Sequence, residues 1–295
     1  MLQNIRHKLI LGFSLGLMLS TIPVTASMQN EGIDWVSGYY YASGEAVVPS
    51  PEEEPNRSRA ILKAKGYAKM RAIADLRVSV ENTVVSYRAA GRDLLSKDND
   101  LRQVVESYMA NANVVNERQQ NEGNDTVIAI GIQAPMFGHQ GICSAMLRSR
   151  AIHDMITGRA SDVSIDRRSD LKTSSILTGI KGPFSSVIVD CIGIGIERAI
   201  FPILRRSDGG EINAVMSIDN GVCDRGAVAY SRNLDDAKRN PRAGANPLIV
   251  RAIGRAGDKY MCDAVISDPD ADRVAQENET SHFLDKCNMI FVLEN

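Results

Sequence analysis

Four carboxylates near the end of the chain have the spacing of a calcium-binding loop. Positions one, three, five and twelve of that motif are filled by Asp268, Asp270, Asp272 and Glu279. In such a loop the oxygens surround one hard cation, but position six must be glycine for the turn, and here it is Arg273. The same residues fit the start of a helix, where carboxylates cap amides and favour the helix dipole. We favour the helix start, and calcium binding stays an alternative.

A glycine pair near the middle of the chain is similar to part of a dinucleotide-binding loop. Gly193-Ile194-Gly195 follows a strand-like run, but Arg198 stands where the third glycine belongs, and Glu197 would repel a pyrophosphate. The pair is therefore interpreted as a turn or bulge. The sequence predicts no cofactor.

Residues for acid–base or nucleophilic catalysis are sparse. Outside residues 1–26 the histidines are His139, His153 and His282. None lies in a metal-binding or Ser/His/Asp signature, and the G-x-S-x-G motif is absent. Surface or helix-capping roles are expected, although a triad assembled from distant residues is recognised only by geometry. The acidic run 52–54 is interpreted as a solvated loop, so neither an enzyme nor a metal site is predicted.

The cysteines show no metal-binding or redox motif, because no C-x-x-C pair and no histidine at zinc-ligand spacing occurs. Two of them border strand-like apolar runs and have the character of buried small hydrophobic residues. Free buried thiols and at least one disulfide are both compatible with the sequence, and the odd number leaves one thiol outside any intramolecular bridge. The five cysteines are Cys143, Cys191, Cys223, Cys262 and Cys287.

The composition is that of an ordinary globular protein. The chain has 295 residues, 44% of them hydrophobic and 24% charged. This length suggests two domains at roughly 150 residues each. The net charge of −2 and the aromatic content of 5% provide no electrostatic or stacking surface for nucleic acid.

The N-terminus has the pattern of a secretory signal peptide. Arg6 and Lys8 precede an apolar stretch at 9–19, and small residues at 24–26 suit a signal peptidase. The stretch is about 11 residues, too short to cross a bilayer core of about 30 Å; an uncleaved anchor is the alternative. Removal of residues 1–26 would change the net charge from −2 to −4. A periplasmic protein is predicted.

The first half of the chain alternates strand and helix patterns. A strand at 38–48 leads to a helix that begins after Asn56 and has small apolar residues every fourth position. From Arg77 apolar residues recur at every second position, which predicts a strand continuing directly from the helix. An amphipathic helix over 101–109 precedes a hairpin. The hairpin strands are predicted at 112–118 and 125–134.

The second half predicts further strands and helices after a polar connector, with one helix candidate at 142–156. Short helices are expected at 234–238 and 271–278. Strands are expected at 187–189, 248–253, 263–266 and 289–293, and a hairpin at 201–206 and 211–217.

The predicted fold class is α+β, with two domains that each have a small, mostly antiparallel sheet and packed helices. The predicted division is a signal peptide at 1–26, a split α/β domain at 27–137, a connector at 138–182 and a C-terminal α/β domain at 183–295.

Two blocks of sequence resemble a known family. RAILKAKGYAKMRAIADLRVSVENTVV (Arg59–Val85) and LRQVVESYMANANVV (Leu101–Val115) resemble the core of flagellar outer-membrane proteins of FlgP type, which group with small bacterial surface lipoproteins. The segments Val187–Ile212, Gly226–Ile253 and Phe283–Glu294 are similar to the C-terminal region of longer relatives.

The resemblance implies a non-enzymatic envelope protein. Members are similar to ring or disc subunits around the flagellar base, at the periplasmic side of the outer membrane. The implied partners are further copies of this chain, forming a homo-oligomer or ring, and flagellar basal-body or outer-membrane proteins. This chain lacks the lipid-acceptor cysteine near the cleavage site, so its attachment would need protein contacts.

Three functions remain to be compared. A scaffold would form rings through head-to-tail interfaces, with an exposed strand such as 125–134 pairing at its edge. A binding module for an envelope polymer or small solute would use a cleft between the domains. A hydrolase built from distant residues is the third.

Overall fold

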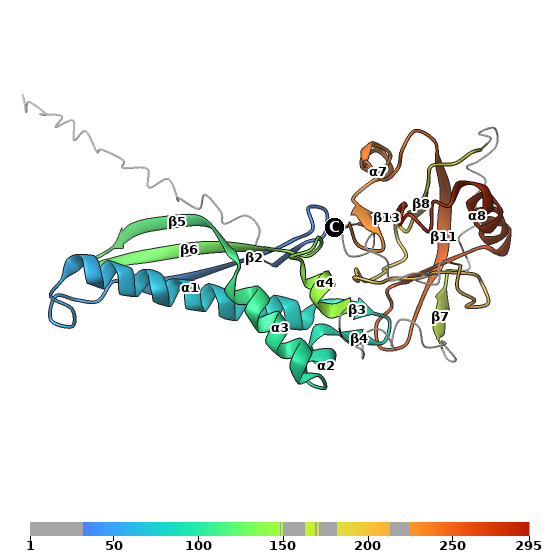
Figure 1. Cartoon of the computed structure of the whole chain (residues 1–295). Coiled ribbons are helices and arrows are strands. Elements are labelled where there is room, and N and C mark those ends of the chain that lie inside the picture. Colours follow the sequence, from blue (N-terminus) through green and yellow to red (C-terminus); the bar gives the residue numbers. More distant parts are fainter. Residues whose placement is uncertain are drawn as a thin grey trace, which may run out of the picture.

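The protein consists of two units placed end to end (Figure 1). The computed structural model describes residues 32–147, 149, 163–168, 170, 182–212 and 225–294. The predicted signal peptide, most of the predicted connector, His153 and Cys223 lie outside these residues. Helices and sheets are present in both units, so the α+β class is confirmed.

The N-terminal unit is built on an antiparallel sheet with the strand order β1-β2-β6-β5. The predicted hairpin is present, and Gly123 adopts the positive φ of 61° that its tight turn requires. The strands are β1 (Gly32–Asp34), β2 (Tyr39–Val47), β5 (Asn113–Glu122) and β6 (Asp125–Pro135).

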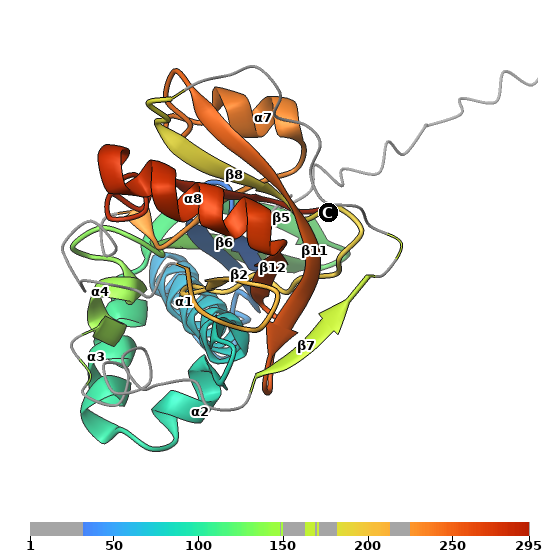
Figure 2. The same cartoon turned by 90° about the vertical axis from the view of Figure 1, so that its right-hand side faces the viewer.

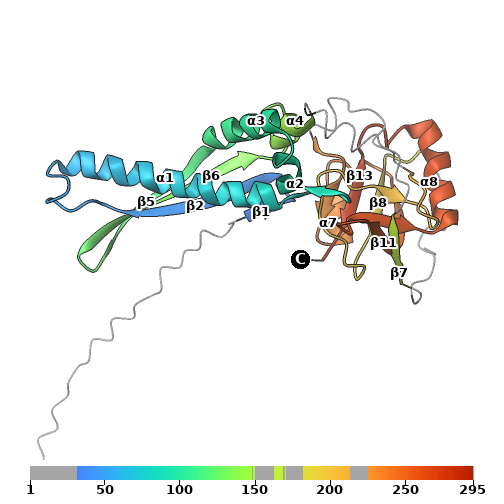
Figure 3. The ribbon, with the colours of Figure 1, turned by 90° about the horizontal axis from the view of Figure 1, so that it is seen from below.

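One long helix, α1 (Arg57–Asn82), runs alongside this sheet (Figure 3). Asn56 caps it as predicted, accepting a hydrogen bond from the N–H of Arg59 at 3.0 Å. Small side chains at every fourth position let the helix lie close to β2. The buried stripe is Ala60, Ala64, Ala68, Ala72, Leu76 and Val80.

The strand predicted from Arg77 is wrong, because α1 continues to Asn82. Val80 extends the four-residue stripe and is fully buried, whereas Val78 is exposed. Valines at 78 and 80 fit the two-residue period of a strand, and Val80 also fits the four-residue spacing of the buried helix stripe. Burial of that stripe against the sheet favours the helix. Thr83 caps the C-terminal end of the helix, and its hydroxyl donates to the carbonyl of Ser79 at 2.8 Å.

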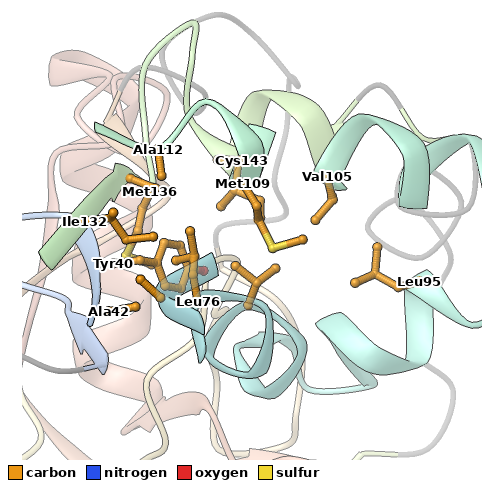
Figure 4. Close-up of a cluster of buried hydrophobic side chains, with 14 of the residues drawn as sticks. Tyr40, Ala42, Leu76, Leu95, Val105, Met109, Ala112, Ile132, Met136 and Cys143 are labelled. Atoms are coloured by element: carbon orange, nitrogen blue, oxygen red, sulfur yellow. The ribbon is translucent and has the colours of Figure 1, made fainter. Parts of the chain in front are cut away.

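Three short helices close the end of this unit nearest the C-terminal unit. They are α2 (Gly91–Leu95), α3 (Asn99–Ala110) and α4 (Ile142–Leu147). In Figure 4 Met109 lies beside Cys143, and Tyr40 lies beside Met136; all four belong to one shared core. Although α4 lies beyond residue 137, its Cys143 belongs to this core, and the predicted helix at 142–156 is described only over its first turns.

The C-terminal unit contains a seven-stranded sheet with the order β10-β13-β8-β11-β12-β9, and β7 also pairs with β11. The strands predicted at 187–189, 248–253, 263–266 and 289–293 and both short helices are found close to their expected bounds. Of the hairpin predicted at 201–206 and 211–217, Leu204 and Arg205 form a strand and Arg205 makes a single bridge to Glu211, and residues 213–217 lie outside the described residues. The strands are β7 (Ser164–Arg167), β8 (Ser186–Asp190), β9 (Leu204–Arg205), β10 (Ala229–Ser231), β11 (Pro247–Gly257), β12 (Asp263–Ile266) and β13 (Met289–Val292).

This second sheet is mixed, which corrects the prediction of a mostly antiparallel one. The neighbours β10, β13, β8 and β11 all run parallel, and only β12 and β7 are antiparallel to β11. Helix α7 (Leu234–Arg239) covers one face and α8 (Asp268–Ser281) the other (Figure 2). Parallel strands are stable where both faces are covered, and β8 is buried along its whole length.

A small hairpin joins the two units. It consists of β3 (Val84–Ser86) and β4 (Ala89–Ala90), with Tyr87 between them. The carbonyl of Tyr87 accepts hydrogen bonds from the N–H groups of Lys259 and Tyr260 at 3.0 and 3.1 Å. The carbonyls of β3 residues 84 and 85 accept hydrogen bonds from the N–H groups of residues 200 and 201. Backbone hydrogen bonds therefore connect the units directly.

Candidate functional site

The carboxylates at the calcium-like spacing lie on α8, which confirms the interpretation as a helix start. Ser267 caps the helix, and its hydroxyl oxygen accepts from the N–H of Asp270 at 3.3 Å. Glu279 stands about 16 Å further along the axis than Asp268, at roughly 1.5 Å per residue. That separation is too large for the two carboxylates to share one cation.

The exposed carboxylates at this helix start contact a neighbouring loop. Ser207 donates to Asp268 from its N–H at 3.2 Å and its hydroxyl at 2.7 Å, and the hydroxyl contact lowers the pKa of Asp268. Arg206 Nη2 lies 2.8 Å from Asp272. Within the part of the chain that the structure describes, no group of three or more histidine, cysteine or acidic side chains is arranged to hold a metal.

The glycine pair forms a turn, as interpreted. Gly193 and Gly195 have φ values of 78° and 73°, a region that favours glycine. Their carbonyls accept from Arg168 Nη1 at 2.9 Å and Arg255 Nη1 at 2.7 Å. The backbone oxygens of this turn are thus used to hold two arginines.

The two described histidines lie at the surface or at a helix end. His139 is exposed. His282 ends α8 with a φ of 54°, and its Nδ1 lies 3.0 Å from the carboxylate of Asp285. His282 therefore has a capping position, in agreement with the prediction.

The prediction of a solvated acidic loop is wrong for one of its residues. Glu52 and Glu53 are exposed, but Glu54 is only 7% exposed. Its carboxylate lies 2.6 Å from Lys63 Nζ and 3.8 Å from Arg59 Nη1. The hydrogen bond from Lys63 lowers the pKa of Glu54, and the contact attaches the loop to α1.

The described cysteines are buried thiols with no disulfide among them. Burial raises the pKa of Cys191 and Cys262 well above the usual value. A thiol that stays protonated is a poor nucleophile. The four are Cys143, Cys191, Cys262 and Cys287.

The sequence did not indicate a buried ion pair in the C-terminal unit. Arg205 on β9 and Asp263 on β12 have fully buried side chains, and Arg205 Nε donates to Asp263 at 2.7 Å. The other carboxylate oxygen accepts from the N–H of Ile203 at 2.9 Å. Burial raises the pKa of Asp263 to about 6, against the opposing effect of Arg205.

This ion pair also contacts the hairpin of the N-terminal unit. The guanidinium carbon of Arg205 lies 4.9 Å from the centre of the Tyr87 ring, which is a cation–π distance. Arg205 Nη1 donates to the carbonyl of Gly209 at 2.9 Å and lies 3.4 Å from Glu211. Because the guanidinium is fully enclosed, the cluster is suited to holding the units together rather than to contacting a substrate.

Among the described residues, the large exposed apolar side chains lie in the N-terminal unit. All nine large ones among the described residues lie between 36 and 115, and four of these lie on α1. Along the ranges described, no helix is both long and apolar enough to pass through a bilayer. The nine are Val36, Val47, Leu62, Tyr67, Met70, Val78, Val104, Val114 and Val115.

The edge strands of the N-terminal sheet are β5 and the short β1, and the strand predicted at 125–134 is not an edge. That strand, β6, is central and pairs with both β2 and β5. Nearly every residue of β5 is exposed. Glu117 and Arg118 lie on this edge, and Lys65 of α1 lies 2.6 Å from Glu117. Charges on an edge strand oppose unwanted pairing.

The comparison with known families concerns the C-terminal unit. The family model for the second domain of the Treponema pallidum protein Tp0624 matches residues 186–295. The match begins at the first residue of β8 and includes the rest of that unit. A search of curated proteins yields no significant match. Residues 186–295 are therefore similar to this Treponema pallidum domain.

Proposed function

We propose that this protein is an exported, non-enzymatic scaffold of the bacterial envelope that assembles with copies of itself through its N-terminal unit. The signal-peptide pattern supports a periplasmic location. The resemblance of residues 59–85 and 101–115 to FlgP-type proteins supports a place at the flagellar base, on the periplasmic side of the outer membrane.

The observation that carries the proposal is an apolar stripe on the outer face of α1. Leu62, Met70 and Val78 are 69%, 57% and 54% exposed. They alternate with Gly66 and Ala74 at four-residue steps, opposite the buried stripe. Exposed apolar side chains gathered along one helix face support an interaction site there.

Gly66 supports the use of this stripe as a contact face. A glycine inside a helix costs about 1 kcal/mol relative to alanine. A Cβ at Gly66 would meet no atom within 4 Å, so nothing within the described chain requires glycine there. A missing side chain lets a second backbone approach closely.

We expect Met70→Glu to weaken self-association at least about tenfold, because a carboxylate at the centre of the stripe must be desolvated on contact. Light scattering over a concentration series measures this. The matched control is Ala275→Glu on the exposed face of α8, which should associate like the original protein. A monomer at every concentration, in the original protein, would contradict the proposal.

We expect Gly66→Ala to raise the free energy of unfolding by about 0.5–1 kcal/mol, since it removes the helix-interior glycine and its Cβ meets nothing. The same change should weaken self-association, because a methyl group would separate the two backbones. Urea unfolding and light scattering measure the two effects. If Gly66→Ala stabilises the protein but leaves self-association unchanged, the part of the stripe around Gly66 does not belong to the interface.

The flagellar part of the proposal is tested in cells. Deletion of the gene should change the structure seen at flagellar bases and reduce motility. Normal motility with an unchanged basal structure would contradict the flagellar part of the proposal. Self-assembly through α1 is tested separately by the light-scattering experiment.

A further inference from the structure

A cleft of about 390 Å³ lies between the two units. The N-terminal unit contributes the turn containing Trp35 and the ring of Phe137. The C-terminal unit contributes Arg225 and Arg242, and no acidic side chain is among the described residues that line the cleft. The two arginines and the two aromatic residues of the cleft thus come from different units.

Arg242 is only 8% exposed and its charge has no carboxylate partner among the described residues. Its Nη1 donates to the carbonyls of Gly226 at 3.1 Å and Cys287 at 3.2 Å. Nε and Nη2 have no acceptor in the described part of the chain. This pair of donors forms one side of the guanidinium and matches the two oxygens of a carboxylate or phosphate.

Arg225 places a second positive charge beside Arg242. Its Nη2 donates to the carbonyl of Lys286 at 2.7 Å, so a backbone contact fixes its position. Burial and the charge of Arg225 lower the pKa of Arg242 to about 10. Two adjacent cations in a partly buried site repel each other unless an anion lies beside them.

The aromatic residues of the N-terminal unit in the cleft are held by contacts with the C-terminal unit. The rings of Trp35 and Tyr230 pack edge to face with centres 5.4 Å apart. Phe137 lies against Gly226, where a Cβ would be 2.5 Å from the ring. The Asp34 carboxylate next to Trp35 accepts from the N–H groups of its own turn at 3.0 and 3.1 Å, and Asp34 is not among the described residues that line the cleft.

We infer that this cleft binds a small organic oxyanion, a carboxylate or phosphate carried on an apolar or planar body. Arg242 and Arg225 bind the oxyanion, and Trp35 and Phe137 contact the body. This activity goes beyond the proposed scaffold function and does not depend on it, because the cleft and the outer face of α1 are separate surfaces.

The test uses Trp35, which is the single tryptophan of the chain and lies in the cleft. Its fluorescence is followed during titration with phenyl phosphate, benzoate and the neutral benzyl alcohol. We expect a saturable change with at least one oxyanion, with a dissociation constant below about 1 mM, and none with benzyl alcohol. The oxyanion with the lower dissociation constant shows whether the cleft prefers a phosphate or a carboxylate.

Arg242→Gln and Arg225→Gln should each weaken binding of that oxyanion at least about tenfold. Arg239→Gln is the matched control, because Arg239 is exposed and pairs with Asp236 outside the cleft. If Arg242→Gln fails to fold, the exposed Arg225 still tests the site. The inference is wrong if neither oxyanion saturates, if benzyl alcohol acts equally, or if Arg225→Gln binds like the original protein.

Discussion

Replacing Arg205 with Met, or Asp263 with Leu, is expected to lower the free energy of unfolding by about 3–5 kcal/mol. Both side chains are fully buried and joined at 2.7 Å, so either substitution leaves a buried charge without its buried partner, and Arg205 would keep only the partly buried Glu211 at 3.4 Å. Urea denaturation followed by circular dichroism measures the loss. The expected cost is larger than for any exposed ion pair of this chain.

The double substitution of Arg205 and Asp263 distinguishes this explanation from a simple loss of packing. It should cost much less than the two single changes together, since both buried charges are removed at once. Arg206→Met is the matched control. Arg206 pairs with Asp272 at a partly exposed position, and such pairs contribute about 0–1 kcal/mol. The explanation is wrong if the losses in free energy of unfolding for the two single substitutions add up in the double variant. It is also wrong if Arg205→Met and Arg206→Met lower the free energy of unfolding equally.

The same ion pair should influence the contact between the units. Arg205 lies against the Tyr87 ring, and Tyr87 accepts backbone hydrogen bonds from residues 259 and 260. Loss of Arg205 removes the cation–π contact from the hairpin that joins the units. Limited proteolysis should then cut near residues 84–90 more readily than in the original protein.

Gly44→Ala is expected to destabilise the protein by about 2–3 kcal/mol. A Cβ at Gly44 would lie 2.2 Å from the carbonyl oxygen of Ala68 and 2.5 Å from the backbone nitrogen of Ala72. Both atoms belong to the helix backbone, so no side chain can move aside. The substitution must push α1 away from β2 along the centre of the N-terminal core.

Gly66→Ala is the matched control for this prediction, because it makes the same chemical change on the open face of α1, away from the face that contacts Gly44 of β2. Urea midpoints should move in opposite directions for the two variants. An unchanged midpoint for Gly44→Ala would mean that α1 and β2 are not in close contact at this position.

Local patterns were sufficient for the elements whose side chains alternate between core and solvent. The alanine stripe of α1, its cap at Asn56 and the hairpin around Gly123 were predictable because each depends on residues a few positions apart. The helix start at Asp268 was predictable for the same reason. At Val78 and Val80 the residue pattern fitted both a strand and a helix, so the local pattern was insufficient. Burial of Val80 against the sheet decided that this segment is helical.

By itself, then, the sequence determined the α+β class and the positions of most helices and strands. Tertiary structure alone decided that β8, β11 and β13 run parallel, and that Arg205 meets Asp263 across 58 positions of sequence. It also decided that Trp35 and Arg242 line the same cleft. These contacts join distant segments, and periodicity and capping describe only neighbouring residues, so the partner of a buried charge is not determined until the units pack together.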